Sequence, residues 1–148
     1  MIHEEVQELL SFVDKNPTAF HTTASIREIL LQEGFTELLE SRKWDLTPGE
    51  GYFVCRNGSS VIAFRLGTDL KDYSFNVAAG HTDSPCFKIK ENAELTGSGC
   101  RRLAVEKYGG MLMSTWMDRP LGIAGRVLLR RGSGIESRLL DLGGECAV

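Results

Sequence analysis

Apolar side chains at the start of the chain recur at the spacing of a helix. Over residues 2–14 they return every three or four positions with acidic residues opposite, which predicts an amphipathic helix that Asn16-Pro17 ends. The same spacing predicts a second helix from about residue 22 to residue 33. A threonine at residue 22 or 23 is expected to cap its start, and Gly34 its end.

Shorter, β-rich runs follow after residue 50. Residues 52–56 and 60–65 flank Asn57-Gly58, and both of these turn residues accept positive φ, so a β-hairpin is predicted there. The run 75–79 is apolar between polar flanks and predicts a buried strand. Residues 87–90 alternate between apolar and basic side chains, which predicts a half-exposed strand.

A change in pattern divides the chain. Polar residues over 91–94 and glycines within 97–99 predict a loop-rich break, and we place a domain boundary at about residue 92. Four β-rich segments follow, separated by turns: residues 102–107, 111–117, 124–131 and 137–142. The expected fold class is therefore α/β, with a mixed domain over residues 1–92 and the start of a β-rich domain over residues 93–148.

Composition excludes several classes of protein. With 42% hydrophobic and 25% charged residues and no apolar run of membrane-spanning length, a globular protein with no membrane partner is expected. The net charge of −3 argues against nucleic acid as a main partner. Acidic residues stand where a secretory signal carries bases, and the four cysteines include no Cys-x-x-Cys pair. Together these features favour reduced thiols and a cytoplasmic location.

Candidate chemistry lies directly after the predicted strand 75–79. Gly80 frees the backbone there, and His81 and Asp83 would share a face of extended chain two positions apart. A neutral imidazole is a good zinc ligand, and a neighbouring carboxylate can orient its ring. The spacing alone also fits an exposed pair joined by a local hydrogen bond, so both interpretations stay open from the residues themselves.

Longer strings around this pair resemble a known family. The segment 79–85, Ala-Gly-His-Thr-Asp-Ser-Pro, is similar to a signature of the M18 (aspartyl aminopeptidase-like) metalloaminopeptidases. Residues 105–110, Val-Glu-Lys-Tyr-Gly-Gly, and residues 114–127, from Ser-Thr-Trp-Met-Asp-Arg-Pro to Ala-Gly-Arg-Val, look like two further strings of that family in the same order. Residues 17–21 also resemble its N-terminal segment.

The resemblance implies a fold, an activity and a site. It implies the N-terminal part of a zinc-peptidase α/β sandwich, followed by the start of an inserted β-rich domain that serves in homo-oligomer contacts. The family's enzymes remove N-terminal residues from peptides with two zinc ions per active site. By this resemblance His81 binds one zinc, and Asp83 is the catalytic-site carboxylate that orients the imidazole and does not bind metal.

The same resemblance implies that the site is incomplete in these 148 residues. The family's other zinc ligands and its general-base glutamate come from later sequence, and no motif here corresponds to them. The expectation is an N-terminal fragment that is inactive alone. The alternative is a non-catalytic truncated module with an oligomerisation or regulatory role.

Two further readings are weaker. A different co-catalytic zinc peptidase family would not explain the Ser84-Pro85 continuation or the string around Trp116. A serine or cysteine hydrolase lacks its Gly-x-Ser-x-Gly elbow, and Pro85 has no N–H to serve an oxyanion hole. His21 is expected to cap or pack at a helix start, with metal binding as the open alternative.

Overall fold

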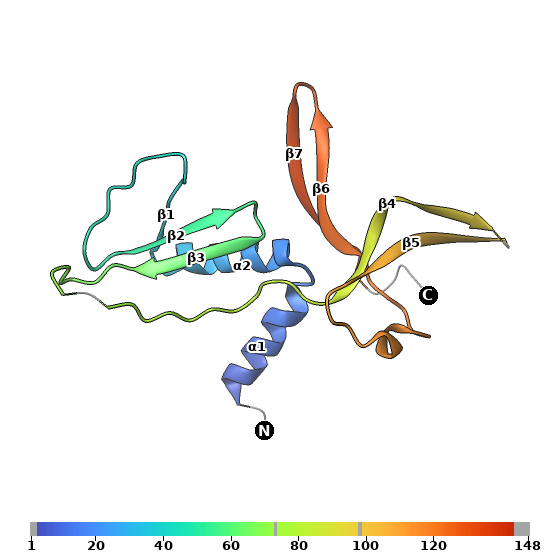
Figure 1. Ribbon diagram of the computed structural model, residues 1–148, viewed down its shortest axis with the longest axis horizontal. Helices are drawn as coiled ribbons and strands as arrows, with labels where there is room; N and C mark the ends of the chain where they lie inside the picture. The colour runs from blue at the N-terminus through green and yellow to red at the C-terminus, as the bar shows by residue number, and fades with distance from the viewer. Residues whose placement is uncertain (1–2, 73, 98, 144–148) are drawn as a thin grey trace.

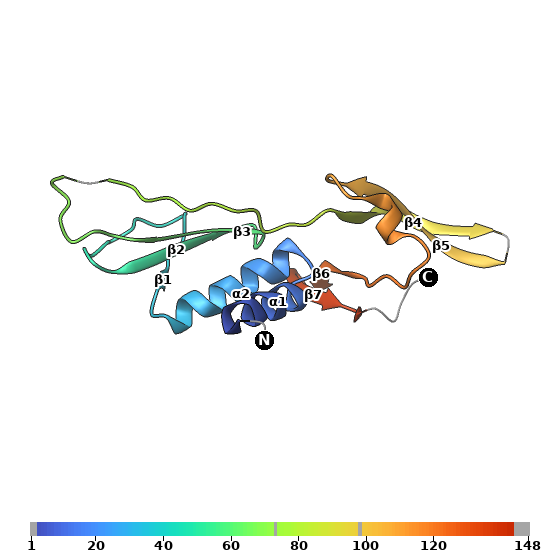
Figure 2. The same ribbon diagram turned by 90° about the horizontal axis from the view of Figure 1, so that it is seen from below.

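The computed structural model describes residues 3–72, 74–97 and 99–143, and shows one helix–sheet layer from which two hairpins project separately (Figure 1). Within these residues the strands form a three-stranded sheet in the order β1-β2-β3, a hairpin β4-β5 and a hairpin β6-β7. Helix α2 covers one face of the three-stranded sheet (Figure 2). No helix of the described residues is long and apolar enough to cross a membrane.

Both predicted helices form. Helix α1 spans Glu4–Lys15, and α2 spans Ala19–Gln32, so the second helix begins three residues earlier than expected. The N-cap is Thr18, which is extended and accepts a hydrogen bond from the backbone N–H of His21. Gly34 follows the C-cap with φ of 79°, as predicted, because the left-handed conformation is open to glycine.

The hairpin around Asn57-Gly58 is confirmed. Strand β2, Gly51–Arg56, pairs antiparallel with β3, Ser60–Arg65, and the two turn residues have φ of 54° and 65°. The short strand β1, Thr36–Glu37, adds to β2 in parallel. A helix leading into a parallel strand pair gives this part of the chain its α/β character.

The core lies where α2 meets the middle of this sheet. Phe53 on β2 is fully buried, and Tyr52 is 6% exposed. Thr23 of α2 is also buried, and its hydroxyl finds no hydrogen-bond partner among the described residues. A Cβ on Gly51 would lie 2.7 Å from the ring of Phe35, so glycine permits the close approach of the segment after α2 to β2.

Three sequence expectations are wrong in the described structure. The run 75–79 belongs to no strand, and Val77 is 81% exposed, because a strand needs a neighbouring backbone and none of the described sheets includes this run. Residues 111–117 hold the 3₁₀ helix η1, Met113–Trp116, in which the Thr115 hydroxyl donates to Leu112 O at 2.8 Å. The third is the loop over 91–94.

Residues 91–94 lie inside strand β4, Cys86–Gly97, which pairs antiparallel with β5, Cys100–Tyr108. The register shifts between Ile89 and Glu94, so an irregularity replaces the expected loop. The backbone therefore runs as one strand through residue 92, and the domain boundary at that position stays a prediction. The last two predicted β segments are confirmed as strands: β6 spans Ala124–Arg131 and pairs antiparallel with β7, Gly134–Asp141.

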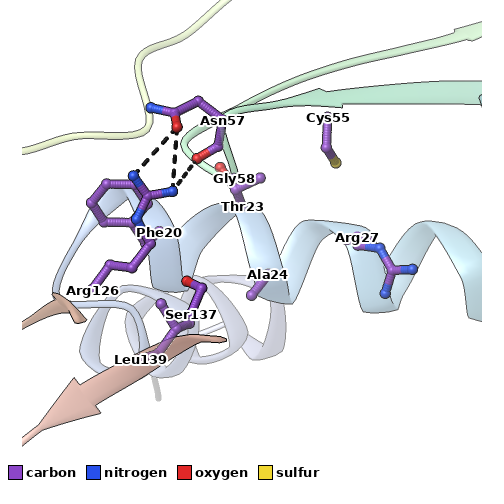
Figure 3. Close-up of a pocket in the computed structure, with 10 residues that line it drawn as sticks. All are labelled: Phe20, Thr23, Ala24, Arg27, Cys55, Asn57, Gly58, Arg126, Ser137 and Leu139. Atoms are coloured by element: carbon purple, nitrogen blue, oxygen red, sulfur yellow. Dashed lines mark hydrogen bonds between the residues drawn. The ribbon is translucent and has the colours of Figure 1, made fainter. Parts of the chain in front are cut away.

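Arg126 joins the β6–β7 hairpin to the helix–sheet layer (Figure 3). Its Nη1 donates to Asn57 O at 2.6 Å, both Nη atoms lie 3.3 Å from Asn57 Oδ1, and the guanidinium stands 4.2 Å from the ring centre of Phe20. Beside it lies a cavity of about 290 Å³, whose lining includes Thr23 and Leu139. One guanidinium thus holds α2, the β2–β3 turn and β6 together.

We expect the 148-residue chain to self-associate in solution. Val77 is 81% exposed, Ile62 on β3 is 71% exposed, and Ile135 near the tip of the β6–β7 hairpin is 72% exposed, which leaves much apolar surface in water. Light scattering after size-exclusion chromatography should show a mass that rises with concentration. Val77→Lys should reduce that rise, and a monodisperse monomer with a cooperative melt would contradict the expectation.

Candidate metal site

The two candidate residues lie in the turn that leads into β4. Neither belongs to a strand, and their side chains are exposed, at 79% for His81 and 44% for Asp83. The hydroxyl of Thr82, between them, donates to Ser59 O at 2.8 Å, which ties the turn to the β2–β3 hairpin. The structure therefore brings the predicted pair together on an accessible surface.

Hydrogen bonding defines which nitrogen of His81 is available. Its Nδ1 lies 2.7 Å from the backbone oxygen of Asp83 and 3.4 Å from Asp83 Oδ1. A carbonyl oxygen only accepts hydrogen bonds, so Nδ1 carries the proton. In the neutral imidazole Nε2 then keeps its lone pair, which is the state in which histidine binds a metal.

The Asp83 carboxylate has a second partner, on β5. The hydroxyl of Tyr108 donates to Asp83 Oδ2 at 2.7 Å. Because this bond favours the charged carboxylate, it holds the pKa of Asp83 below its ordinary value, and it raises the pKa of Tyr108. The β4–β5 register places Tyr108 opposite Cys86, directly beside the turn that carries Asp83.

The strings singled out in the sequence converge on this turn. Pro85 lies against Gly109, where an added Cβ would come 3.4 Å from the proline Cα. The ring of Phe87 meets that of Trp116 edge to face at 5.6 Å. Residues 16–18 and 81–84 both line a cavity of about 180 Å³. Residues 16–18 and 109 therefore lie beside the turn that carries His81, and Trp116 packs on the start of the strand that follows it.

The donor set fits a metal only in part. His81 offers one imidazole nitrogen with its other nitrogen already bonded, as metal-binding histidines do. A zinc site takes at least three protein ligands, and the described residues contain no group of three His, Cys, Asp or Glu side chains placed to hold a metal ion. His81 thus fits as one ligand of a site whose other ligands are not among the described residues.

His21 behaves as a helix-start residue. Its Nδ1 lies 2.8 Å from the Thr18 hydroxyl, and its backbone N–H donates to the same oxygen at 3.4 Å. The cap is therefore Thr18, and His21 packs beside it at the helix start. Among the described residues no cluster of three metal-binding side chains includes His21.

Tyr108 is the residue of this site whose role sequence reasoning missed. It stands in the string 105–110 that carries the family resemblance, but it lies 25 positions from Asp83. Only the pairing of β4 with β5 brings the two side chains together. The family resemblance of this string pointed to Tyr108 but did not indicate that its partner is Asp83.

Comparison with known proteins decides the family. The model of the family described as aminopeptidase I zinc metalloprotease (M18) matches residues 12–143. This chain belongs to the M18 family. It is 44% identical over 140 residues to a probable M18 family aminopeptidase 2 of Clostridium novyi, and 39% identical over 142 residues to the aspartyl aminopeptidase of Caenorhabditis elegans.

The M18 chain spans only about a third of the length of these relatives. The alignments cover 91% and 95% of this chain but 32% and 30% of the relatives. The solved mApe1 dodecamer of S. cerevisiae superposes with a TM-score of 0.79 and 33% identity, over 94% of this chain and 33% of that chain. The helices and sheets described above thus match those of M18 aminopeptidase structures.

Proposed function

We propose that these residues are the N-terminal part of a zinc-dependent aminopeptidase that removes N-terminal residues from peptides. The observation that carries the proposal is the orientation of His81. Its Nδ1–H is held by Asp83, its side chain is exposed, and Nε2 makes no hydrogen bond to the described residues. Family membership supports it, since the family is described as a zinc metalloprotease. Residues 1–92 would belong to its α/β sandwich and residues 93–148 to an inserted β-rich domain.

His81 would bind one of two zinc ions through Nε2, and Asp83 would be the catalytic-site carboxylate that orients the imidazole. When bound, zinc supplies Lewis-acid polarisation and an activated water for peptide hydrolysis. The residues of this chain hold the imidazole in one tautomer, while the remaining ligands and the general base would come from residues beyond those described. The aspartyl aminopeptidase relative makes peptides with an acidic first residue the first substrates to test.

A homo-oligomer and a cytoplasmic location complete the proposal. The yeast relative was solved as a dodecamer, and the apolar side chains exposed on the β6–β7 hairpin offer surface for such contacts. Leu128 and Ile135 are 62% and 72% exposed there. The absence of a Cys-x-x-Cys pair agrees with reduced thiols in a cytoplasm.

The protein purified from its natural source should be tested by intact mass, metal content and peptidase activity. We expect about two zinc ions per active site, and His81→Ala should lower kcat/KM by more than the roughly 10- to 100-fold that neighbours of metal ligands are worth. His3→Ala is the matched control, because His3 is exposed and its side chain makes no capping hydrogen bond to helix α1. Full activity in His81→Ala would refute the proposed role.

A second candidate is a non-catalytic module that contributes an oligomerisation or regulatory surface. The observation favouring it is that the described residues offer no three-ligand cluster for a metal. The same measurement separates the two candidates. A natural mass matching 148 residues with little bound zinc would support the module, and a larger mass with about two zinc ions would support the peptidase.

A further inference from the structure

Tyr108 holds the carboxylate that faces His81. Its hydroxyl donates to Asp83 Oδ2 at 2.7 Å, while the other carboxylate oxygen, Oδ1, lies 3.4 Å from His81 Nδ1. The nearest acceptor for the Nδ1–H is the backbone oxygen of Asp83, at 2.7 Å, and the carboxylate adds a second, longer contact at the same nitrogen. Nε2 makes no hydrogen bond to the described residues. The hydroxyl of Tyr108 donates to Asp83 and not to His81, so its effect on the imidazole is expected to pass through Asp83.

The carboxylate needs an external partner to stay in place. Asp83 is 44% exposed and lies in a turn with no strand bonds of its own, so its side chain could rotate into water. Tyr108, in contrast, is anchored: it ends strand β5, paired opposite Cys86, and is followed by Gly109 against Pro85. The strand is therefore the fixed element and the turn is the one being held.

We propose that Tyr108 is a positioning residue, which fixes the Asp83 carboxylate against His81 Nδ1 and so raises the electron density that Nε2 offers to a metal or another electrophile. The inference rests on the proposed function only in naming zinc as the metal. The arrangement of the three side chains is observed in this chain and does not depend on that function. A carboxylate facing the distal N–H of a histidine raises the basicity of the ligating nitrogen.

The experiment treats the 148-residue chain, without metal, with diethyl pyrocarbonate at a pH where imidazoles are neutral. Mass spectrometry measures the rate of acylation at each histidine separately. The reagent acylates a bare imidazole nitrogen, so its rate at His81 reports the nucleophilicity of Nε2. We expect Tyr108→Phe to lower the rate of acylation at His81 about threefold. This is less than the roughly 10- to 100-fold effect on metal affinity or activity that is typical of mutating a direct neighbour of a metal-bound histidine. The rate at His21 serves as an internal reference and should not change.

Two variants test the route through Asp83. In an Asp83→Ala background Tyr108→Phe should have no further effect, because the residue through which it acts is gone. Tyr52→Phe is the matched control: it removes a hydroxyl that accepts from Thr47 N at 2.8 Å, far along the chain, and should leave His81 unchanged. Equal His81 rates in the wild type and Tyr108→Phe, or an effect that persists without Asp83, would overturn the inference.

A parallel arm with Zn²⁺ alone separates this inference from the proposed function. It uses the metal-stripped protein as its natural source makes it, because His81 is only one ligand and the described residues supply no three-ligand cluster for zinc. Zn²⁺ should protect His81 from the reagent, and Tyr108→Phe should require several times more Zn²⁺ for the same protection. If Zn²⁺ protects nothing while Tyr108→Phe still slows His81, the metal role of His81 is wrong and the positioning role stands. If Zn²⁺ protects His81 equally in both proteins and the metal-free rates are equal, the positioning role is wrong and the metal role stands.

Discussion

Phe53→Ala should lower the free energy of unfolding by about 3–5 kcal/mol, the range for truncating a fully buried aromatic side chain. Phe53 has no exposed surface and sits on the central strand β2, between β1 and β3. Its backbone oxygen accepts from Leu38 N at 2.8 Å, a bond that the substitution leaves intact, so the loss comes from packing. Chemical denaturation followed by circular dichroism would measure it.

The matched control is Ile62→Ala on the adjacent strand. Ile62 pairs opposite Val54 in the same hairpin but is 71% exposed, so its truncation should change stability by no more than about 0.5 kcal/mol. Since small domains are held by only about 5–15 kcal/mol, Phe53→Ala alone should bring this layer close to unfolding at room temperature. A Phe53→Ala loss no larger than that of Ile62→Ala would mean that the core lies elsewhere.

Local chemistry explains which elements the sequence predicted. Asn57-Gly58 specifies its hairpin because both residues adopt positive φ at low cost, and Gly34 ends α2 for the same reason. The run 75–79 failed because an apolar run becomes a strand only beside another strand, and that information lies outside the run. Thr115 shows a third case, in which a hydroxyl bonding back to Leu112 favours a 3₁₀ turn over a β pattern.

The candidate site divides in the same way. His81 and Asp83 are two positions apart, so their proximity could be predicted from spacing and was supported by the family resemblance. The Tyr108 bond depends on the register of β4 with β5, which pairs residues 86 and 108 and shifts between residues 89 and 94. No local pattern encodes a register across such an irregularity, so this contact could only come from the structure.

Arg126→Ala should release the β6–β7 hairpin from the helix–sheet layer. The guanidinium donates to both oxygens of Asn57 and stands over Phe20, so its loss removes charge-assisted hydrogen bonds and a cation–π contact at once. Together these are worth about 2–3 kcal/mol. Within the described residues no other β6 side chain hydrogen-bonds to the helix–sheet layer, so the orientation of the hairpin should become variable. The backbone pairing of β6 with β7 does not involve the guanidinium and should remain.

Distances between spin labels at Glu28 on α2 and Ile135 near the hairpin tip would measure this, in a background without native cysteines; both positions are exposed. The wild type should give one narrow distribution and Arg126→Ala a broad one. Arg126→Lys should resemble the alanine variant, because an ammonium cannot reproduce the planar fork. Arg130→Ala, a matched loss of charge on the same strand, should stay narrow. A narrow distribution in Arg126→Ala would show that the apolar contacts around the cavity, and not the guanidinium, orient the hairpin.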